Sequence, residues 1–293
     1  MSRVSLVQAG GDIEASVRRS VDLVGGLNLK NGRKVVVKPN ICNPKNPQGM
    51  VITDFDIIET VIKMAREKGG DVTVVESDNI AGPAERRITD SGLMTRLDSL
   101  GVPFLNLSRD DYEAHKVAGI ELELPKTVLE ADYLVNLPKI KTCAHTLVTL
   151  SIKNLYGVFR AAKKSAYHRH LDEILPYLAK TVRSDLIVVD GITCMEGNGP
   201  TVGNSRRMGV IAAGTNTVSV DSFCSRLMGF DPAGIAHIAN ASRAGVGEMD
   251  VDKIEVVGDD WEGFVCHFER PYSLRATLKS LRTVRDIYMS GST

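Results

Sequence analysis

Short runs of β-branched residues alternate with helical segments along the chain, and this alternation constrains the fold most strongly. Strands are expected over residues 4–7, 34–38, 72–76, 104–107, 120–124, 133–137, 185–190, 208–213 and 254–257. Helices are expected over residues 12–24, 54–67, 88–100 and 217–228. Continuous apolar strands separated by helices are typical of a parallel sheet covered on both faces. The sequence therefore predicts a doubly wound α/β fold with a mainly parallel sheet, in which the looser stretch 81–124 leaves room for a small inserted lobe.

No linker rich in Pro, Ser or Gly divides the chain. We expect an α/β domain over residues 1–262, alternatively built from two lobes at about 1–130 and 131–262, and a tail over 263–293. The tail contains a predicted amphipathic helix. Its apolar positions are Leu274, Leu278, Leu281, Val284, Ile287 and Tyr288, and its basic positions are Arg275, Lys279, Arg282 and Arg285. We expect the helix to pack on its own domain, with docking to a partner or a membrane surface as the alternative.

Charge and composition exclude several classes of protein. The 36 basic residues balance the 36 acidic ones, whereas a dedicated nucleic-acid binder needs a basic surplus. Nothing approaches 18 consecutive apolar residues, so no transmembrane segment is expected. The five cysteines form no C-x-x-C pair, which argues against the common zinc and iron–sulfur spacings. With no signal-peptide pattern at the start, a cytoplasmic protein is expected.

Polar side chains follow the ends of several expected strands. Lys38 and Asn40 come at the end of the strand 34–38, Glu76 at the end of 72–76, Asn136 near the end of 133–137, and Asp190 at the end of 185–190. Ligands of parallel sheets bind beyond the carboxyl ends of the strands, so we expect these side chains to share one rim. Further candidates for ligand binding follow shortly after: Lys139, Lys141, Thr142, Lys153 and Asn154. Ammonium groups beside the N-terminus of a helix that ends at Gly157 predict an anion pocket, the alternative being solvated surface lysines.

Two acidic residues frame a glycine-rich loop. Asp190 ends the strand 185–190, and Glu196 begins the stretch EGNGPTVG. The spacing matches neither a dinucleotide-binding fingerprint nor a phosphate-binding loop of nucleotide hydrolases. Together with Asp221, these carboxylates could bind Mg²⁺ or transfer protons, and a structural turn is the alternative.

Cys143 and His145 are candidate metal ligands at the edge of the expected pocket. With Cys42 or Cys194 they could form a soft metal site. The alternative is a buried cysteine that acts as a small apolar residue. His168 follows a basic run and is a candidate for proton transfer.

Four motifs point to one known family. They are VVVKPNIC at 35–42, NLPKIKT at 136–142, SIKNLYG at 151–157, and DLIVVDGI followed by EGNGPTVG within 185–203. In these motifs the chain resembles the bacterial and archaeal family called DUF362, over about residues 34–247. Many members carry a further ferredoxin-like segment with two four-iron clusters, and this chain lacks those cysteines. The family motif usually reads Lys-Thr-His, where this sequence has Cys143. The resemblance implies that His168 matches a histidine that recurs in the family.

The leading hypothesis is an enzyme that acts on a small anionic metabolite, a carboxylate or a phosphate. Lys38, Lys139, Lys141 and Lys153 would bind the anion, Asn40, Asn136 and Asn154 would orient it, and His168, Asp190 or Glu196 would transfer protons. One alternative, suggested by the family, is a redox-linked protein that works with an iron–sulfur or flavin partner such as a ferredoxin. Another is a non-enzymatic ligand-binding or assembly protein, including one that assembles with its own copies. The cofactor stays open: a divalent metal is a candidate, and the missing cysteines argue against an intrinsic four-iron cluster.

Overall fold

The computed structural model describes residues 2–284 and 287, and it contains a large mixed sheet of ten strands. The strands of this sheet are β1 (Arg3–Gln8), β2 (Lys34–Pro39), β3 (Asp71–Glu76), β4 (Phe104–Asn106), β7 (Tyr133–Leu137), β8 (Lys139–Cys143), β9 (Leu147–Thr149), β10 (Leu186–Glu196), β11 (Asn204–Gly214) and β12 (Glu255–Gly258). Their order is β12-β1-β11-β10-β7-β2-β3-β4, and β8 joins β10 to β9. All neighbours from β10 to β4 are parallel, whereas β11 is antiparallel to both β1 and β10.

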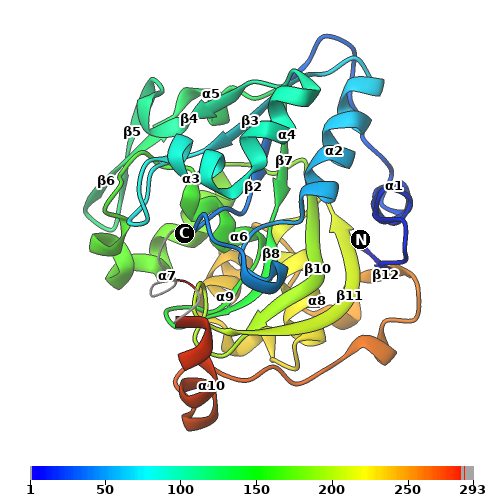
Figure 1. Cartoon of the computed structure of the whole chain (residues 1–293), viewed down its shortest axis with the longest axis vertical. Coiled ribbons are helices and arrows are strands. Elements are labelled where there is room, and N and C mark those ends of the chain that lie inside the picture. Colours follow the sequence, from blue (N-terminus) through cyan, green and yellow to red (C-terminus); the bar gives the residue numbers. More distant parts are fainter. Residues whose placement is uncertain (1, 285–286, 288–293) are drawn as a thin grey trace.

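Helices cover both faces of the sheet, which confirms the predicted α/β fold. The helices are α1 (Ile13–Leu23), α2 (Phe55–Glu67), α3 (Ala84–Ser91), α4 (Leu93–Leu100), α5 (Lys126–Leu129), α6 (Ser151–Asn154), α7 (Leu171–Thr181), α8 (Thr217–Leu227), α9 (Ala236–Arg243) and α10 (Leu274–Val284). In β2, Val35 and Val37 belong to a core shared with α1 to α4, while Val36 belongs to a core shared with α6 to α9. Alternate residues of a buried strand thus serve opposite helical layers. Figure 1 shows β10 and β11 running side by side, with α8 and α9 behind them.

Three expected elements differ from the structure. The helix expected over 88–100 is two helices, because Gly92 adopts a left-handed φ of 86° that ends α3 before α4 begins. The glycine-rich stretch after Glu196 joins β10 to β11 in a long hairpin, so both strands extend beyond their expected ends. The stretch KIKTC, expected as a strand end leading into a helix, forms β8.

A separate hairpin lies within the loosely patterned stretch. β5 (Tyr112–Val117) was not expected, and it pairs with β6 (Ile120–Pro125) to form a two-stranded sheet of its own. Figure 1 shows this hairpin at the opposite side of the molecule from β12.

The C-terminal helix α10 corrects one expectation. Leu274, Leu278 and Leu281 were expected to pack on the domain, yet they are 78%, 62% and 64% exposed. The helix contacts the protein through its other side, where Ala276 and Thr283 are buried. The expected apolar position Tyr288 and basic position Arg285 lie outside the described residues.

Candidate functional site

A cavity of about 720 Å³ opens beyond the carboxyl ends of β2 and β3. This is the position at which ligands bind in parallel α/β sheets. The polar and aromatic side chains that matter here are those of Lys38, Asn40, Cys42, Glu76, Lys141, Cys143, His145, Lys153, Asn154, Tyr156, Lys164 and His168. Among the lining residues that the structure describes, Glu76 is the single acidic one.

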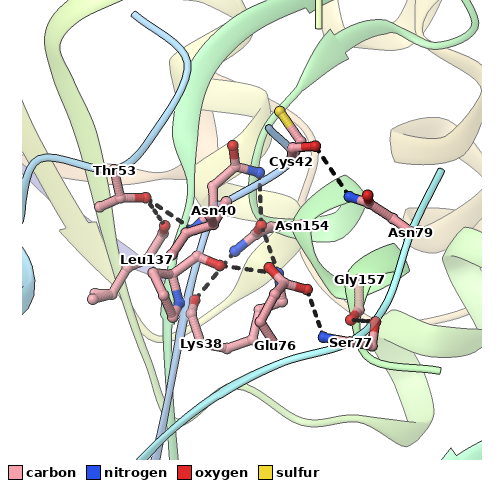
Figure 2. Close-up of polar contacts among 12 residues, drawn as sticks. Lys38, Asn40, Cys42, Thr53, Glu76, Ser77, Asn79, Leu137, Asn154 and Gly157 are labelled. Atoms are coloured by element: carbon pink, nitrogen blue, oxygen red, sulfur yellow. Dashed lines mark hydrogen bonds and ion pairs between the residues drawn. The ribbon is translucent and has the colours of Figure 1, made fainter. Parts of the chain in front are cut away.

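Lys38 forms the centre of a buried polar network at the end of β2. Its Nζ donates hydrogen bonds to Glu76 Oε2 at 3.0 Å, to Asn154 Oδ1 at 3.1 Å and to the carbonyl of Pro39 at 3.0 Å (Figure 2). An ammonium group has three N–H donors, so this lysine is fully paired. Burial lowers the pKa of Lys38, and the attraction of Glu76 offsets part of that effect.

Gly157 leaves room for the Lys38–Glu76 ion pair to lie directly beside its backbone. A Cβ atom at that position would lie 2.7 Å from Lys38 Nζ, which is closer than Cβ atoms approach other atoms in proteins, and 3.0 Å from Glu76 Oε1, which is tight. The last residue of the motif SIKNLYG is therefore a glycine because the ion pair occupies the space of a side chain.

Asn40 connects this network to a second buried lysine. Its amide nitrogen donates to Asn154 Oδ1 at 2.9 Å, and its Oδ1 accepts from Lys141 Nζ at 2.6 Å. Lys141 Nζ also donates to the carbonyl of Val51 at 2.7 Å and lies 3.4 Å from Cys42 Sγ. Lys141 is fully buried, and none of the described carboxylates pairs with it; burial lowers its pKa. The described groups that contact its ammonium nitrogen are the Asn40 amide, the Val51 carbonyl and the Cys42 sulfur.

Two further lysines have N–H donors that no described residue accepts. Lys164 Nζ donates to Ser77 Oγ at 2.9 Å and to the carbonyl of Asp78 at 2.6 Å, which leaves one donor. Lys153 Nζ lies 3.7 Å from the centre of the Tyr156 ring and has no hydrogen-bond acceptor among the described residues. Desolvation lowers the pKa of Lys153 to about 8 and that of Lys164 to about 7.

Two histidine rings lie together at the edge of the cavity. The ring centroids of His145 and His168 are 4.1 Å apart, and the Tyr156 ring lies 6.1 Å from that of His168. Burial, His145 and Lys153 lower the pKa of His168 to about 4, and burial also lowers that of His145. His168 is therefore neutral at pH 7 and is able to accept or relay a proton.

Several predicted site residues do not line this cavity in the described part of the chain: Asn136, Lys139, Thr142, Asp190 and Glu196. Asn136 contacts a residue that lines the cavity, because its Oδ1 accepts a hydrogen bond from Asn154 Nδ2 at 2.8 Å. Thr142 donates to the carbonyl of Gly197 at 2.8 Å. The expectation that all these side chains share one rim is therefore met only in part.

The carboxylates expected to transfer protons are bound within the protein. Asp190 Oδ2 lies 2.5 Å from Lys139 Nζ and accepts from the backbone N–H of Asp54 at 2.7 Å. Glu196 Oε2 lies 2.7 Å from Arg206 Nε, on the β10–β11 hairpin. The Asp190 carboxylate thus joins β10 to β8 and to the start of α2, and the Glu196 carboxylate joins β10 to β11.

Asp221 corrects the expected role of the helix N-terminus. Its carboxylate accepts from the backbone N–H and the hydroxyl of Ser151 at 2.8 and 2.6 Å, and from the N–H of Ile152 at 2.9 Å. These groups begin α6, so the N-terminus of that helix is already occupied by an anion of the protein itself. Burial raises the pKa of Asp221 to about 7 against these three hydrogen bonds.

The predicted metal ligands Cys143 and His145 both line the cavity. Cys194 does not, and Cys42 contacts Lys141. Within residues 2–284 and 287, no group of three or more His, Cys, Asp or Glu side chains is arranged to bind a metal ion. The metal site therefore stays a sequence-based prediction.

Lys164 and Tyr156 are the residues that sequence reasoning missed. Lys164 begins a short 3₁₀ segment that returns to the cavity, and the hydroxyl of Tyr156 donates to its carbonyl at 2.7 Å. No periodicity marks this segment. The adjacent pair Lys163 and Lys164 was visible in the sequence, but only the fold separates the exposed lysine from the buried one.

Residues 35–226 match the family described as Domain of unknown function (DUF362). The match covers the cavity residues of β2, β3, β8 and α6. This protein belongs to the DUF362 family. It is also 28% identical over 289 residues to the "Thylakoid-associated protein sll1697" of Synechocystis, covering 92% of this chain and 90% of the relative. Both matches include the lysines that line the cavity, but neither states a reaction.

The Lys139–Asp190 pair generates a stability prediction. Asp190→Asn leaves the buried Lys139 ammonium without its counter-charge, so the free energy of unfolding should fall by roughly 3–5 kcal/mol. The double variant Asp190→Asn/Lys139→Met removes both charges and should recover much of that loss. Urea denaturation of the three proteins measures this. A single variant as stable as wild type would contradict the assigned structural role.

Lys153 generates a pH prediction. Its amine should lose its proton around pH 8, whereas a solvated lysine does so near ~10.4. Labelling with acetic anhydride from pH 6 to 10, followed by peptide mass spectrometry, should therefore give a Lys153 rate that reaches half its maximum near pH 8. If the rate at Lys153 follows the same pH profile as the surface lysines in the same digest, the proposed desolvation is wrong.

Proposed function

We propose that this protein is an enzyme that acts on a small metabolite bearing a carboxylate or phosphate group, bound in the cavity beyond β2 and β3. The observation that carries the proposal is the unbalanced charge of the cavity lining. Lys141, Lys153 and Lys164 make no contact with a carboxylate among the described residues, while Glu76 is already paired with Lys38.

The unused N–H donors support an external anion. Buried polar groups in stable proteins almost always have hydrogen-bond partners, and an unpaired buried charge is costly. Among the described residues, no group accepts from the three N–H donors of half-buried Lys153 or from the third donor of buried Lys164. A carboxylate or phosphate oxygen is the acceptor that suits them best.

Groups that could serve chemistry lie in the same cavity. His168 is uncharged at pH 7 and lies near Lys153, whose charge contributes to its lowered pKa. We assign proton transfer to His168 rather than to Asp190 or Glu196, because those two carboxylates are bound to Lys139 and Arg206. Lys141, with its donors already occupied, contributes positive potential to the cavity rather than a direct contact.

A second candidate function, membrane-surface association, is supported by α10. Leu274, Leu278 and Leu281 lie along one stripe of the helix and are exposed, whereas Ala276 and Thr283 on the other side are buried. The helix is therefore seated on the protein with its leucine stripe directed to solvent.

Charge and the relative's name favour a membrane over a protein partner for this stripe. Arg275 is exposed, and the sequence places Lys279 and Arg282 in the same helix, as in helices that lie on anionic lipid. The Synechocystis relative is called thylakoid-associated. In the described part of this chain, no helix is both long and apolar enough to cross a bilayer, so such binding would be peripheral.

The anion proposal predicts measurable binding of oxalate and inorganic phosphate by calorimetry. Lys164→Met removes a charged hydrogen-bond donor worth about 1.5–3 kcal/mol, so the affinity should fall roughly ten- to a hundredfold. The adjacent Lys163→Met, at an exposed position, is the matched control and should bind as wild type does. Equal affinity in both variants, or no binding by the wild-type protein, would reject the proposal.

The membrane proposal predicts cosedimentation with vesicles rich in phosphatidylglycerol. Replacing Leu274, Leu278 and Leu281 with serine should weaken binding at least tenfold, because each leucine contributes up to about 2 kcal/mol on burial. Ile80→Ser, which removes an apolar side chain that is 87% exposed elsewhere, should have no effect. Wild-type protein that stays in the supernatant would contradict the idea.

A further inference from the structure

Lys153, which is half-buried, differs from the buried lysines of the cavity in what surrounds its amine. Lys38 and Lys141 are each bound by three protein groups, and Lys164 is bound by two. The Lys153 amine contacts the face of Tyr156, and no described residue accepts a hydrogen bond from it. It is the one of these four amines that makes no hydrogen bond to a described residue.

The surroundings of Lys153 also suit a nucleophilic amine. A lysine attacks a carbonyl only as the neutral amine, and desolvation in an apolar environment favours that form. With a pKa of about 8, about a tenth of the Lys153 amine is neutral at pH 7. Tyr156 fixes the side chain through its ring alone, because its hydroxyl donates to the carbonyl of Lys164.

We propose that Lys153 forms a covalent imine with the aldehyde or ketone carbon of a small oxo acid, whose carboxylate binds to Lys164. This inference rests on the proposed function, and it narrows the substrate from anions in general to anions that carry a carbonyl group.

The chemistry is a condensation that needs no oxidant. The lone pair of Lys153 Nζ adds to the carbonyl carbon, and one proton moves from the nitrogen to the former carbonyl oxygen to give a carbinolamine. The hydroxyl group then takes up a second proton and leaves as water while the nitrogen lone pair forms the C=N bond, and the nitrogen gives up its remaining proton to leave the neutral imine. His168, whose ring lies at the edge of the same cavity, is the group placed to relay these protons.

Borohydride trapping tests the proposal. The 293-residue protein is incubated at pH 7 with glyoxylate, pyruvate, 2-oxoglutarate or succinic semialdehyde, then reduced with sodium borohydride and analysed by intact-mass and peptide mass spectrometry. We expect one reduced adduct per chain, at Lys153, with at least one of these acids. Lys153→Arg, which keeps the charge, should lose the adduct, while Lys163→Arg at the exposed neighbour should retain it.

A separate binding measurement distinguishes the two proposals. Oxalate binding to the same preparations is measured by calorimetry, because oxalate has carboxylate groups but no aldehyde or ketone. Oxalate binding with no adduct at Lys153, or with equal low labelling of many lysines, overturns the imine and leaves the anion site intact. Absence of binding by oxalate and phosphate overturns the proposed function. If the Lys164→Met variant forms the Lys153 adduct with unchanged yield, Lys164 does not bind the carboxylate, and the proposal as stated is overturned.

Discussion

The buried ion pair between Lys38 and Glu76 is the interaction on which the rest of the site depends. It joins the ends of β2 and β3, and through Asn154 it attaches α6 to the same point. Because Glu76 is the acidic residue among the described lining groups and is already paired, it does not neutralise the other lysines. This ion pair thus joins the ends of two strands, and it leaves the charges of the other cavity lysines without a carboxylate among the described lining residues.

The amides extend this effect across the cavity. Asn154 accepts from Lys38 and Asn40, and Asn40 in turn accepts from Lys141. Lys38 orients the Asn154 amide and Lys141 orients the Asn40 amide, because an ammonium group can only donate hydrogen bonds. The network therefore has one consistent arrangement of donors and acceptors. Lysines of the same cavity therefore differ in their contacts: three protein groups bind each of Lys38 and Lys141, while Lys153 and Lys164 have N–H donors that no described residue accepts.

The fold was largely predictable from the sequence because the strands are apolar on both faces, as Val35, Val36 and Val37 show. The position of the cavity was predictable for the same reason, since the ends of parallel strands meet at one edge. What could not be predicted is pairing between distant residues. The same sequence pattern fits an Asp190 that faces a ligand and one that faces Lys139, and only the register of β8 on β10 decides between them. The prediction that the leucine stripe of α10 packs on the domain was wrong, because helical periodicity identifies an apolar face but not the surface that contacts it.

The central claim is that the lysines of this cavity bind an oxyanion. Crystals soaked in selenate, a tetrahedral analogue of phosphate with a strong anomalous signal, test it most directly. The account predicts an anomalous peak inside the cavity, within hydrogen-bond distance of Lys153 Nζ or Lys164 Nζ, and loss of that peak when the contacting lysine is replaced by methionine. Selenate bound only at basic positions on the outer surface, with neither lysine in contact, would contradict it.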